Sequence, residues 1–323
     1  MKYFKRSIGI CLILILGMLS ACSPAPLSEE GDVLHIVTTV FPAYDWVRML
    51  TQGTDADIRL LTENGVDIHS YQPTAKDIID ISTCDLLVYV GGTSDAWVED
   101  AQKEAVNADM KDISLIRLLG AHAKEEETVE GMEPEEEDEE TAEYDEHVWL
   151  SLKNAEVICT ALSESLCAID PPHREVYQKN LAAYRNELSR LDAAYQSAVD
   201  HASVDTLLFG DRFPFRYLTD DYHLHYYAAF AGCSAETEAS FETVVFLAKK
   251  ADELRLPAIL TLETSDGTIA ETIRENTVRK DQAILTLNSM QSITQKDLDM
   301  GVTYLSVMQD NLTVFETALG SAQ

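Results

Sequence analysis

Leu86-Leu87-Val88-Tyr89-Val90-Gly91-Gly92 is the stretch that decides the fold class of this chain. Five consecutive apolar residues that end in two glycines are typical of a strand buried on both faces, as in a parallel sheet. Two other strand-like runs precede it at 34–40 and 58–61, and helical patterns separate the three runs. This alternation predicts a β/α lobe.

The second half of the chain repeats the same alternation. Strand candidates lie at 206–209, 258–262 and 283–287, and helical patterns lie at 241–254, 269–275 and 302–319. About 300 residues follow the N-terminal segment, which is more than one comfortable hydrophobic core, so we expect two lobes.

A long amphipathic stretch separates the two halves. After Pro171-Pro172, apolar residues recur at alternating spacings of four and three, which places them on one helical face; they are Tyr177, Leu181, Tyr184, Leu188, Leu191 and Tyr195. A helix over 173–201 would be roughly 44 Å long, as suits a spine between lobes. A coiled-coil dimer is the alternative. We expect a monomeric α/β protein with two β/α lobes, mostly parallel central sheets and one long rigid linking helix.

The N-terminus is typical of a secreted lipoprotein. A basic start at 2–6 precedes an apolar run at 8–19 that is too short to span a bilayer comfortably. The run ends in Leu19-Ser20-Ala21-Cys22, which resembles a bacterial lipobox. We expect a signal peptide over 1–21, a lipid anchor on the Cys22 thiol and a tether over 22–31. An ordinary signal peptide that ends in a chance cysteine is the alternative.

The charge of the chain restricts its partners. The formal net charge is −32, so the surface repels phosphate, and nucleic acid is excluded as a partner. Cations are the natural ligands of such a surface. The predicted location is extracytoplasmic, on a cell membrane.

Cysteine use is sparse, although the expected location permits disulfides. Cys159 and Cys167 lie in one helical pattern, where eight residues span about 12 Å, too far for bridging. We expect them not to pair. Cys84 and Cys233 have the pattern of ordinary buried small residues.

The most acidic part of the chain is a single run. From Glu125 to Glu146, 14 of 22 residues are Asp or Glu. Such a run cannot fold by itself near neutral pH, so we expect a disordered loop over 122–146. It is either a solubilising insert or a weak cation collector, which would also gather Ca²⁺ or Mg²⁺.

Two short segments on either side of this region each present one histidine. Gly65-Val66-Asp67-Ile68-His69-Ser70 places His69 in a turn-rich loop just past a strand, where open β/α sheets bind ligands. Asp145-Glu146-His147-Val148-Trp149 places His147 where an acidic loop enters a structured segment. Imidazoles and carboxylates that converge from distant parts of a chain form divalent-metal sites.

These segments resemble those of a known family. Gly65 to Thr74 is similar to the glycine–acid–Pro–His–Ser–aromatic–acid–Pro–Thr segment of ABC-transporter solute-binding proteins of the zinc/manganese cluster. Ile68 stands where that family commonly has proline, and Gln72 where it has glutamate. The stretch 145–150 resembles the family's second histidine segment, and Tyr89-Val90-Gly91-Gly92 with Trp97 also matches.

The resemblance covers nearly the whole mature chain and implies a metal cleft between the two lobes. It implies a protein that captures a divalent metal outside the cytoplasm and delivers it to an ABC permease in the membrane, with His69 and His147 as the first two ligands. The implied domains are a metal-binding lobe over 32–170, a linking helix over 171–202 and a second lobe over 203–323.

The remaining ligands are left open by the same comparison. Where the family usually has a third histidine, this chain has Phe209-Gly210-Asp211, so Asp211 is the candidate, with an N-cap or an ion pair as its alternative role. Asn288 stands where the fourth ligand is often aspartate, and Glu263 competes for that role. His223 and His225 are expected at the lobe surface.

Two imidazoles suit zinc, and each added carboxylate moves the site towards manganese. We expect zinc as the transported ion, with manganese or iron as alternatives. A lipid-anchored zinc hydrolase and a surface adhesin are the competing functions. Without an HExxH, GxSxG, P-loop or GxGxxG pattern, we predict no enzyme activity.

Overall fold

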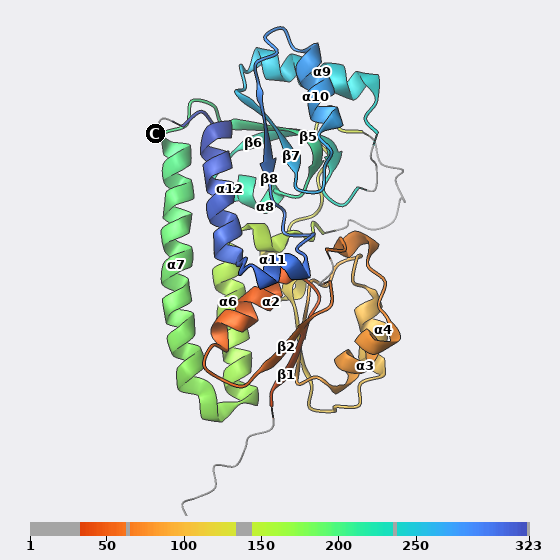
Figure 1. Cartoon of the computed structure of the whole chain (residues 1–323), viewed down its shortest axis with the longest axis vertical. Coiled ribbons are helices and arrows are strands. Elements are labelled where there is room, and N and C mark those ends of the chain that lie inside the picture. Colours follow the sequence, from red (N-terminus) through yellow and green to blue (C-terminus); the bar gives the residue numbers. More distant parts are fainter. Residues whose placement is uncertain (1–32, 63–64, 134–143, 235–237, 322–323) are drawn as a thin grey trace, which may run out of the picture. The chain divides into compact units, whose positions relative to one another are not determined.

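The computed structural model describes residues 33–62, 65–133, 144–234 and 238–321 (Figure 1). The predicted signal peptide, Cys22 and the tether lie outside these residues, as does the part of the acidic run at 134–143. Within the described ranges, no helix is both long and apolar enough to cross a membrane.

The N-terminal lobe is built on a four-stranded parallel sheet with the order β2-β1-β3-β4. Its strands are β1 (His35–Thr38), β2 (Asp57–Leu60), β3 (Leu86–Tyr89) and β4 (Lys111–Ser114). The helices of this lobe are α2 (Phe41–Leu50), α3 (Ala75–Thr83), α4 (Trp97–Lys103) and α5 (Leu115–Leu119), with short 3-10 turns η1 (Ile68–Ser70), η2 (Gly120–His122) and η3 (Val148–Leu150). All four residues of β3 are buried, as its continuous apolar sequence predicts.

The C-terminal lobe repeats this topology with the order β6-β5-β7-β8, and all its pairings are parallel. Its strands are β5 (Thr206–Phe213), β6 (His225–Ala231), β7 (Ala258–Leu262) and β8 (Ala283–Leu287). Its helices are α8 (Arg216–Asp221), α9 (Phe241–Glu253), α10 (Thr268–Asn276), α11 (Gln295–Asp299) and α12 (Tyr304–Ala318). The strands predicted at 258–262 and 283–287 are confirmed; β6 was not predicted.

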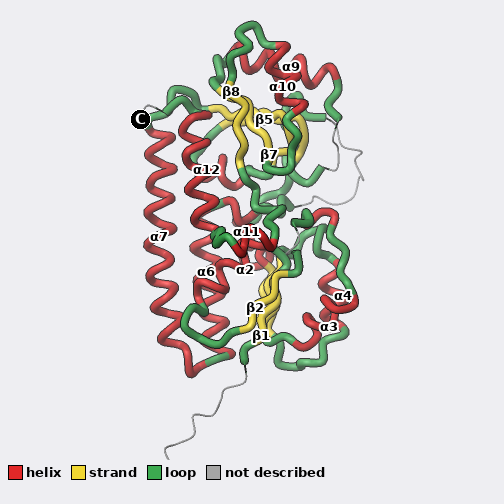
Figure 2. Tube along the Cα trace, viewed as in Figure 1, coloured by secondary structure: helices red, strands yellow, loops and turns green. Residues whose placement is uncertain are grey.

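The linking helix runs beside both lobes (Figures 1 and 2). It is α7 (Arg174–Asp200), which follows α6 (Leu152–Ile169) and the 3-10 turn η4 (Pro171–His173). The side chain of Asn180 donates to the carbonyl of Leu50 at 2.9 Å in the first lobe. The Tyr195 hydroxyl donates to the carbonyl of Met308 at 2.8 Å in the second. The predicted long helix between two β/α lobes is therefore confirmed.

Direct contacts also join the two lobes. The buried carboxylate of Asp45, in α2, accepts a hydrogen bond from the backbone N–H of Tyr304 at the start of α12 (2.8 Å). Because the N-terminus of a helix carries partial positive charge, this position favours a carboxylate. The Trp149 indole donates to the carbonyl of Ser289 at 2.9 Å.

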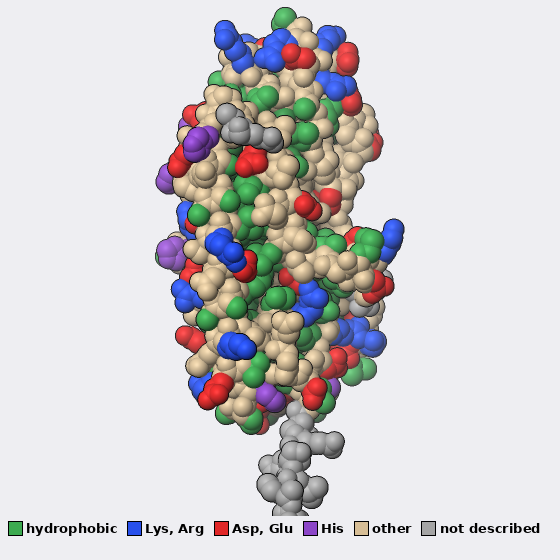
Figure 3. All heavy atoms as spheres, turned by 60° about the vertical axis from the view of Figure 1, so that its left-hand side comes forward, with side chains coloured by type: hydrophobic (Ala, Val, Ile, Leu, Met, Phe, Trp, Pro, Cys, Tyr) green, Lys and Arg blue, Asp and Glu red, His purple; other side chains and the backbone are tan. Residues whose placement is uncertain are grey.

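On the face shown in Figure 3, acidic and basic side chains are interspersed.

The described ends of the acidic run differ from the expected disorder. Residues 124–130 contact the second lobe through three ion pairs: Lys124–Asp220, Glu127–Arg216 and Glu130–Lys250. The carbonyl of Asp145 accepts a hydrogen bond from the Tyr217 hydroxyl. In two of the ion pairs a basic side chain of that lobe compensates charge that would keep an isolated acidic segment unfolded. Cys159 and Cys167 lie on one continuous helix, α6, as predicted, and the four cysteines that the structure describes are free.

Candidate metal centre

His69 lies in η1, in the loop that follows β2. The carboxylate of Asp67 accepts a hydrogen bond from the backbone N–H of His69 (3.1 Å) and so caps this turn. The ring atom Nδ1 lies 2.6 Å from the hydroxyl oxygen of Ser94, which follows β3. Because its backbone and Nδ1 are both held, His69 has Nε2 as the nitrogen that is left for a ligand.

His147 is held in the same manner by a carboxylate. Asp145 Oδ1 accepts a hydrogen bond from the His147 backbone N–H at 2.9 Å and lies 3.0 Å from the ring atom Nδ1. The His147 side chain is fully buried. A carboxylate on one ring nitrogen is the usual partner of a metal-binding histidine, since it fixes the ring and directs the other nitrogen to the ion.

A second carboxylate, that of Glu146, lies against His69. Its Oε1 accepts a hydrogen bond from the Ser94 backbone N–H (2.8 Å), and its Oε2 lies 3.7 Å from His69 Nδ1. A Cβ at position 92 would lie 2.2 Å from Glu146 Oε1. Gly92, which follows β3 in the Gly-Gly pair at 91–92, therefore makes room for this buried carboxylate.

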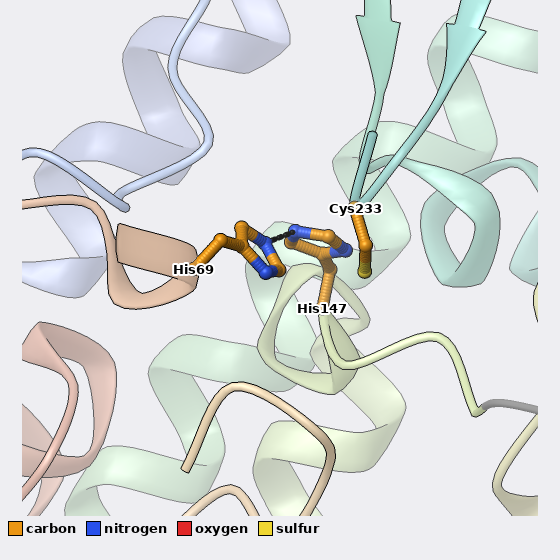
Figure 4. A group of neighbouring side chains, drawn as sticks. All are labelled: His69, His147 and Cys233. Atoms are coloured by element: carbon orange, nitrogen blue, oxygen red, sulfur yellow. Dashed lines mark hydrogen bonds between the residues drawn. The ribbon is translucent and has the colours of Figure 1, made fainter. Parts of the chain in front are cut away.

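The two imidazoles converge through their free nitrogens (Figure 4). His69 Nε2 and His147 Nε2 lie 3.2 Å apart. Two nitrogens bound to one tetrahedral Zn²⁺ at about 2.05 Å would be separated by about 3.3 Å. The spacing of the pair already matches that of two ligands on a single ion.

Gln291, in the loop after β8, contacts both histidines. Its Nε2 lies 2.9 Å from His69 Nε2 and 2.6 Å from His147 Nε2, while its Oε1 lies 3.0 Å from the Ser289 hydroxyl oxygen. This residue belongs to the C-terminal lobe, whereas both histidines belong to the N-terminal lobe. The centre is therefore shared between the lobes.

Cys233 is the third side chain beside the histidine pair that is of a kind able to bind a metal ion. One ring nitrogen of each histidine and the Cys233 Sγ all lie within 4.8 Å of one another. Within the described ranges, this is the one group of three or more His, Cys, Asp or Glu side chains so arranged. Cys233 follows β6, and Figure 4 shows its sulfur beside the His147 ring.

The structure does not bring Asp211 and Glu263 into this group. Asp211 accepts hydrogen bonds from the backbone N–H groups of Arg212 (2.8 Å) and Leu262 (3.0 Å). Glu263 accepts from the backbone N–H and the hydroxyl of Ser289, both at 2.8 Å. The Asp211 carboxylate joins β5 to the end of β7, and the Glu263 carboxylate joins the loops that follow β7 and β8.

The pKa values of the two histidines are shifted in opposite directions by burial and by neighbouring charges. Burial, together with the neighbouring His147, lowers the pKa of His69 to about 4. Burial opposes charge on His147 too, but the Asp145 carboxylate, by its charge and its hydrogen bond, raises the pKa of His147 above its ordinary value. A proton at the pair therefore belongs to His147, and His69 stays neutral down to mildly acidic pH.

A cavity leads to the pair from the surface. It has a volume of about 380 Å³, and its lining includes His69, Ser94, Trp97, Glu146 and Cys233. An ion entering by this cavity meets the Glu146 carboxylate and the thiol before it reaches the buried His147.

Sequence reasoning missed the two residues that the C-terminal lobe contributes. Asn288 was the candidate in the loop after β8, but its side chain accepts from the Met290 backbone N–H, and Gln291, three residues later, reaches the histidines. Cys233 was taken for a buried small residue. Because β6 itself was not predicted, nothing in the sequence indicated that Cys233 lies just beyond the end of a parallel strand.

Two β/α lobes on a helical spine, with paired imidazoles and donors from both lobes, define a two-lobed metal-binding protein. The chain belongs to the family described as zinc-uptake complex component A, periplasmic (ZnuA), which matches residues 36–318.

Relatives and solved structures agree with this assignment. The zinc-binding lipoprotein AdcA of Streptococcus pneumoniae is 31% identical over 302 residues, which cover 91% of this chain and 57% of AdcA. The chain thus spans little more than half of that relative. The high-affinity zinc uptake system protein ZnuA of Bacillus subtilis is 26% identical over 318 residues, 97% of this chain and 96% of that protein.

The crystal structure of the Zn(II)-bound ZnuA-like domain of S. pneumoniae AdcA superposes with a TM-score of 0.70 at 28% identity. It covers 89% of this chain and 99% of that domain. The metal-dependent lipoprotein YcdH of B. subtilis gives 0.73 at 26% identity, covering 88% and 99%.

Proposed function

We propose that this protein captures Zn²⁺ outside the cytoplasm and delivers it to an ABC permease, with His69 and His147 as the ligands from the N-terminal lobe. The observation that carries the proposal is the 3.2 Å separation of the two Nε2 atoms, each on a ring whose other nitrogen has a partner. Zinc-bound and zinc-uptake relatives of the same fold support zinc as the ion.

Capture exchanges a proton for the ion. The two facing Nε2 atoms can share one proton, which the raised pKa of His147 assigns to that ring. A divalent ion entering by the cavity displaces this proton, because only a deprotonated nitrogen coordinates metal. Asp145 keeps the His147 ring in place while the proton leaves, and the Glu146 carboxylate attracts the approaching cation.

The N-terminal lobe holds the histidines, and the C-terminal lobe closes over the ion. The proposed domains are the signal peptide over 1–21, the tether over 22–31, the lobes over 32–170 and 203–323, and the linking helix over 171–202. We further propose that Cys22 carries the lipid anchor, that the protein is a monomer, and that the permease takes up the ion when the lobes separate.

Ligation by Asp211 and Glu263, as predicted from the sequence, would require both carboxylates to leave the hydrogen bonds described above. Two imidazole ligands without a carboxylate ligand favour zinc over manganese. The family comprises transport proteins that bind a substrate.

Competitive titration of Zn²⁺ and Mn²⁺ against a chelator of known affinity tests the proposal on the purified full-length protein. We expect one tightly held Zn²⁺ per chain, lost in His69→Ala and in His147→Ala. His122→Ala serves as the control, because it removes an exposed histidine that is not part of the histidine pair, and it should bind zinc as the parent does. Near-normal zinc affinity in both site variants would refute the proposal.

A further inference from the structure

The turn that follows β6 brings a thiol to the metal centre. Cys233 is the second residue beyond the end of β6, and its Sγ lies within 4.8 Å of a ring nitrogen of both His69 and His147. Its side chain also lines the cavity that leads to the pair. From this placement we propose that Cys233 Sγ is the third ligand of the transported ion and makes the centre a His₂Cys site. The inference rests on the proposed function of the histidine pair.

The backbone before Cys233 is shaped for a close approach to His147. A Cβ at position 232 would lie 2.8 Å from the carbonyl oxygen of Phe213 and 3.3 Å from His147 Cε1. A distance under 3.0 Å to a backbone atom does not occur without a shift, so only glycine lets the turn pass at this distance. Gly232 therefore allows the residue that follows it to sit beside the imidazole.

A contact from the first part of the chain holds the same turn. The backbone N–H of Cys233 donates a hydrogen bond to Glu126 Oε1 (2.9 Å). Glu126 belongs to the acidic segment whose neighbours form ion pairs with Arg216 and Lys250. The position of the thiol is thus set by both lobes and does not depend on β6 alone.

The other described cysteines have ordinary structural environments. Cys84 Sγ donates to the carbonyl of Ile81, Cys167 Sγ lies 3.8 Å from the carbonyl of Arg174, and Cys159 is fully buried in α6. None of the three joins a group of metal-type side chains among the described residues. Cys233 is distinguished from them by its place beside the histidine pair.

The chemistry of a thiolate decides which ion the centre prefers. Zinc accepts nitrogen and sulfur ligands together, at about 2.0–2.1 Å and 2.3 Å, whereas Mn²⁺ prefers oxygen. A nitrogen and a sulfur on one tetrahedral ion are about 3.6 Å apart, so capture draws the Cys233 turn towards the histidines. Binding releases the thiol proton to solvent as the sulfur–metal bond forms, and Gln291 or a water occupies the fourth position.

Cobalt substitution tests this ligand directly, with the full-length protein kept reduced. The Co²⁺-loaded parent should show a near-ultraviolet thiolate-to-cobalt charge-transfer band, and Cys233→Ser and Cys233→Ala should lack it. Zinc affinity in both variants should fall by at least about 100-fold, because the loss of a partner behind a ligand already costs about 10- to 100-fold. Cys84→Ala, the matched control, should keep the band and the affinity.

The outcomes separate this inference from the proposed function. A parent protein that binds zinc through His69 and His147, but whose cobalt form has no charge-transfer band and whose affinity survives Cys233→Ala, would overturn the thiolate ligand alone. A parent that binds no metal would overturn both. Because the band is read in the parent protein, the test does not depend on the folding of a variant.

Discussion

The two lobes have the same sheet topology but use the loops after their strands differently. In each lobe the second strand in sequence lies at one edge, followed by the first, third and fourth. In the N-terminal lobe, His69 and His147 are each held by Nδ1, and the two Nε2 atoms face each other and Gln291. In the C-terminal lobe, the carboxylates of Asp211 and Glu263 accept hydrogen bonds from neighbouring backbone N–H groups. Asp211 and Glu263 therefore occupy other places of the repeat than His69, which follows β2 and whose counterpart is the turn after β6 that carries Cys233.

Removing a histidine from the N-terminal lobe should have the largest effect. His147→Ala deletes the fully buried imidazole that we propose as a ligand, so zinc affinity should fall by well over about 100-fold. Isothermal titration with a competing chelator measures the loss. Retention of tight zinc by this variant would mean that the C-terminal lobe holds the ion without the pair.

Acid should weaken zinc binding in two stages, because protons compete with the ion for the histidines. Release of the Cys233 thiol proton already makes affinity fall as the pH is lowered; below the raised pKa of His147 the proton on that ring must leave as well, so the fall should steepen by about a further tenfold per pH unit. His69, whose pKa burial lowers to about 4, adds a second proton only near that pH and makes the fall steeper there. Chelator titration from pH 8 to pH 4 measures both slopes. A flat affinity down to pH 5 would contradict the assignment of the proton to His147.

Asp145→Asn tests the carboxylate behind the buried imidazole. The variant keeps the shape of the side chain but removes the charge that raises the pKa of His147, so zinc affinity at neutral pH should drop about 10- to 100-fold. The onset of acid release should also move to lower pH. Asp57→Asn removes the partner of the exposed His35 and should leave both properties unchanged. Equal affinities for both variants would show that Asp145 does not position the ligand.

Gln291→Ala should have a smaller effect. The amide contacts both Nε2 atoms but is a weaker donor to zinc than an imidazole, so we expect a loss of no more than about tenfold. Stopped-flow release of zinc into excess chelator should be faster, because this residue closes the centre from the C-terminal lobe. A loss as large as that in His147→Ala would make Gln291 an equal ligand.

Asp211→Asn and Glu263→Gln should change zinc affinity least, within about threefold. Their hydrogen bonds hold neighbouring backbone segments of the C-terminal lobe together, so we expect each variant to lose about 1–2 kcal/mol in the free energy of unfolding. Denaturant titration without metal measures this loss. Asp310→Asn, at an exposed position of α12, controls for the removed charge. A large loss of zinc affinity in either variant would restore these carboxylates as ligands and erase the contrast between the lobes.

Local patterns in the sequence predicted much of the fold. The apolar run at 86–90, the strands at 258–262 and 283–287 and the amphipathic repeat from Tyr177 to Tyr195 each depend on periodicity within one segment. The long helix begins at Arg174 because Pro171-Pro172 forms a separate 3-10 turn. The strand β6 was missed because three of its seven residues are alanines, which are depleted in strands.

The sequence by itself determined which segments present imidazoles, because a histidine in a turn between regular elements can be recognised from its neighbours. Only the tertiary structure decided which residues meet them. Cys233 and Gln291 lie 86 and 144 positions from His147, and the folding of two parallel sheets and the spine α7 brings them together. Spacing along the chain carries no signal for such contacts. Their formation depends on the packing of whole lobes, which is a property of the assembled core.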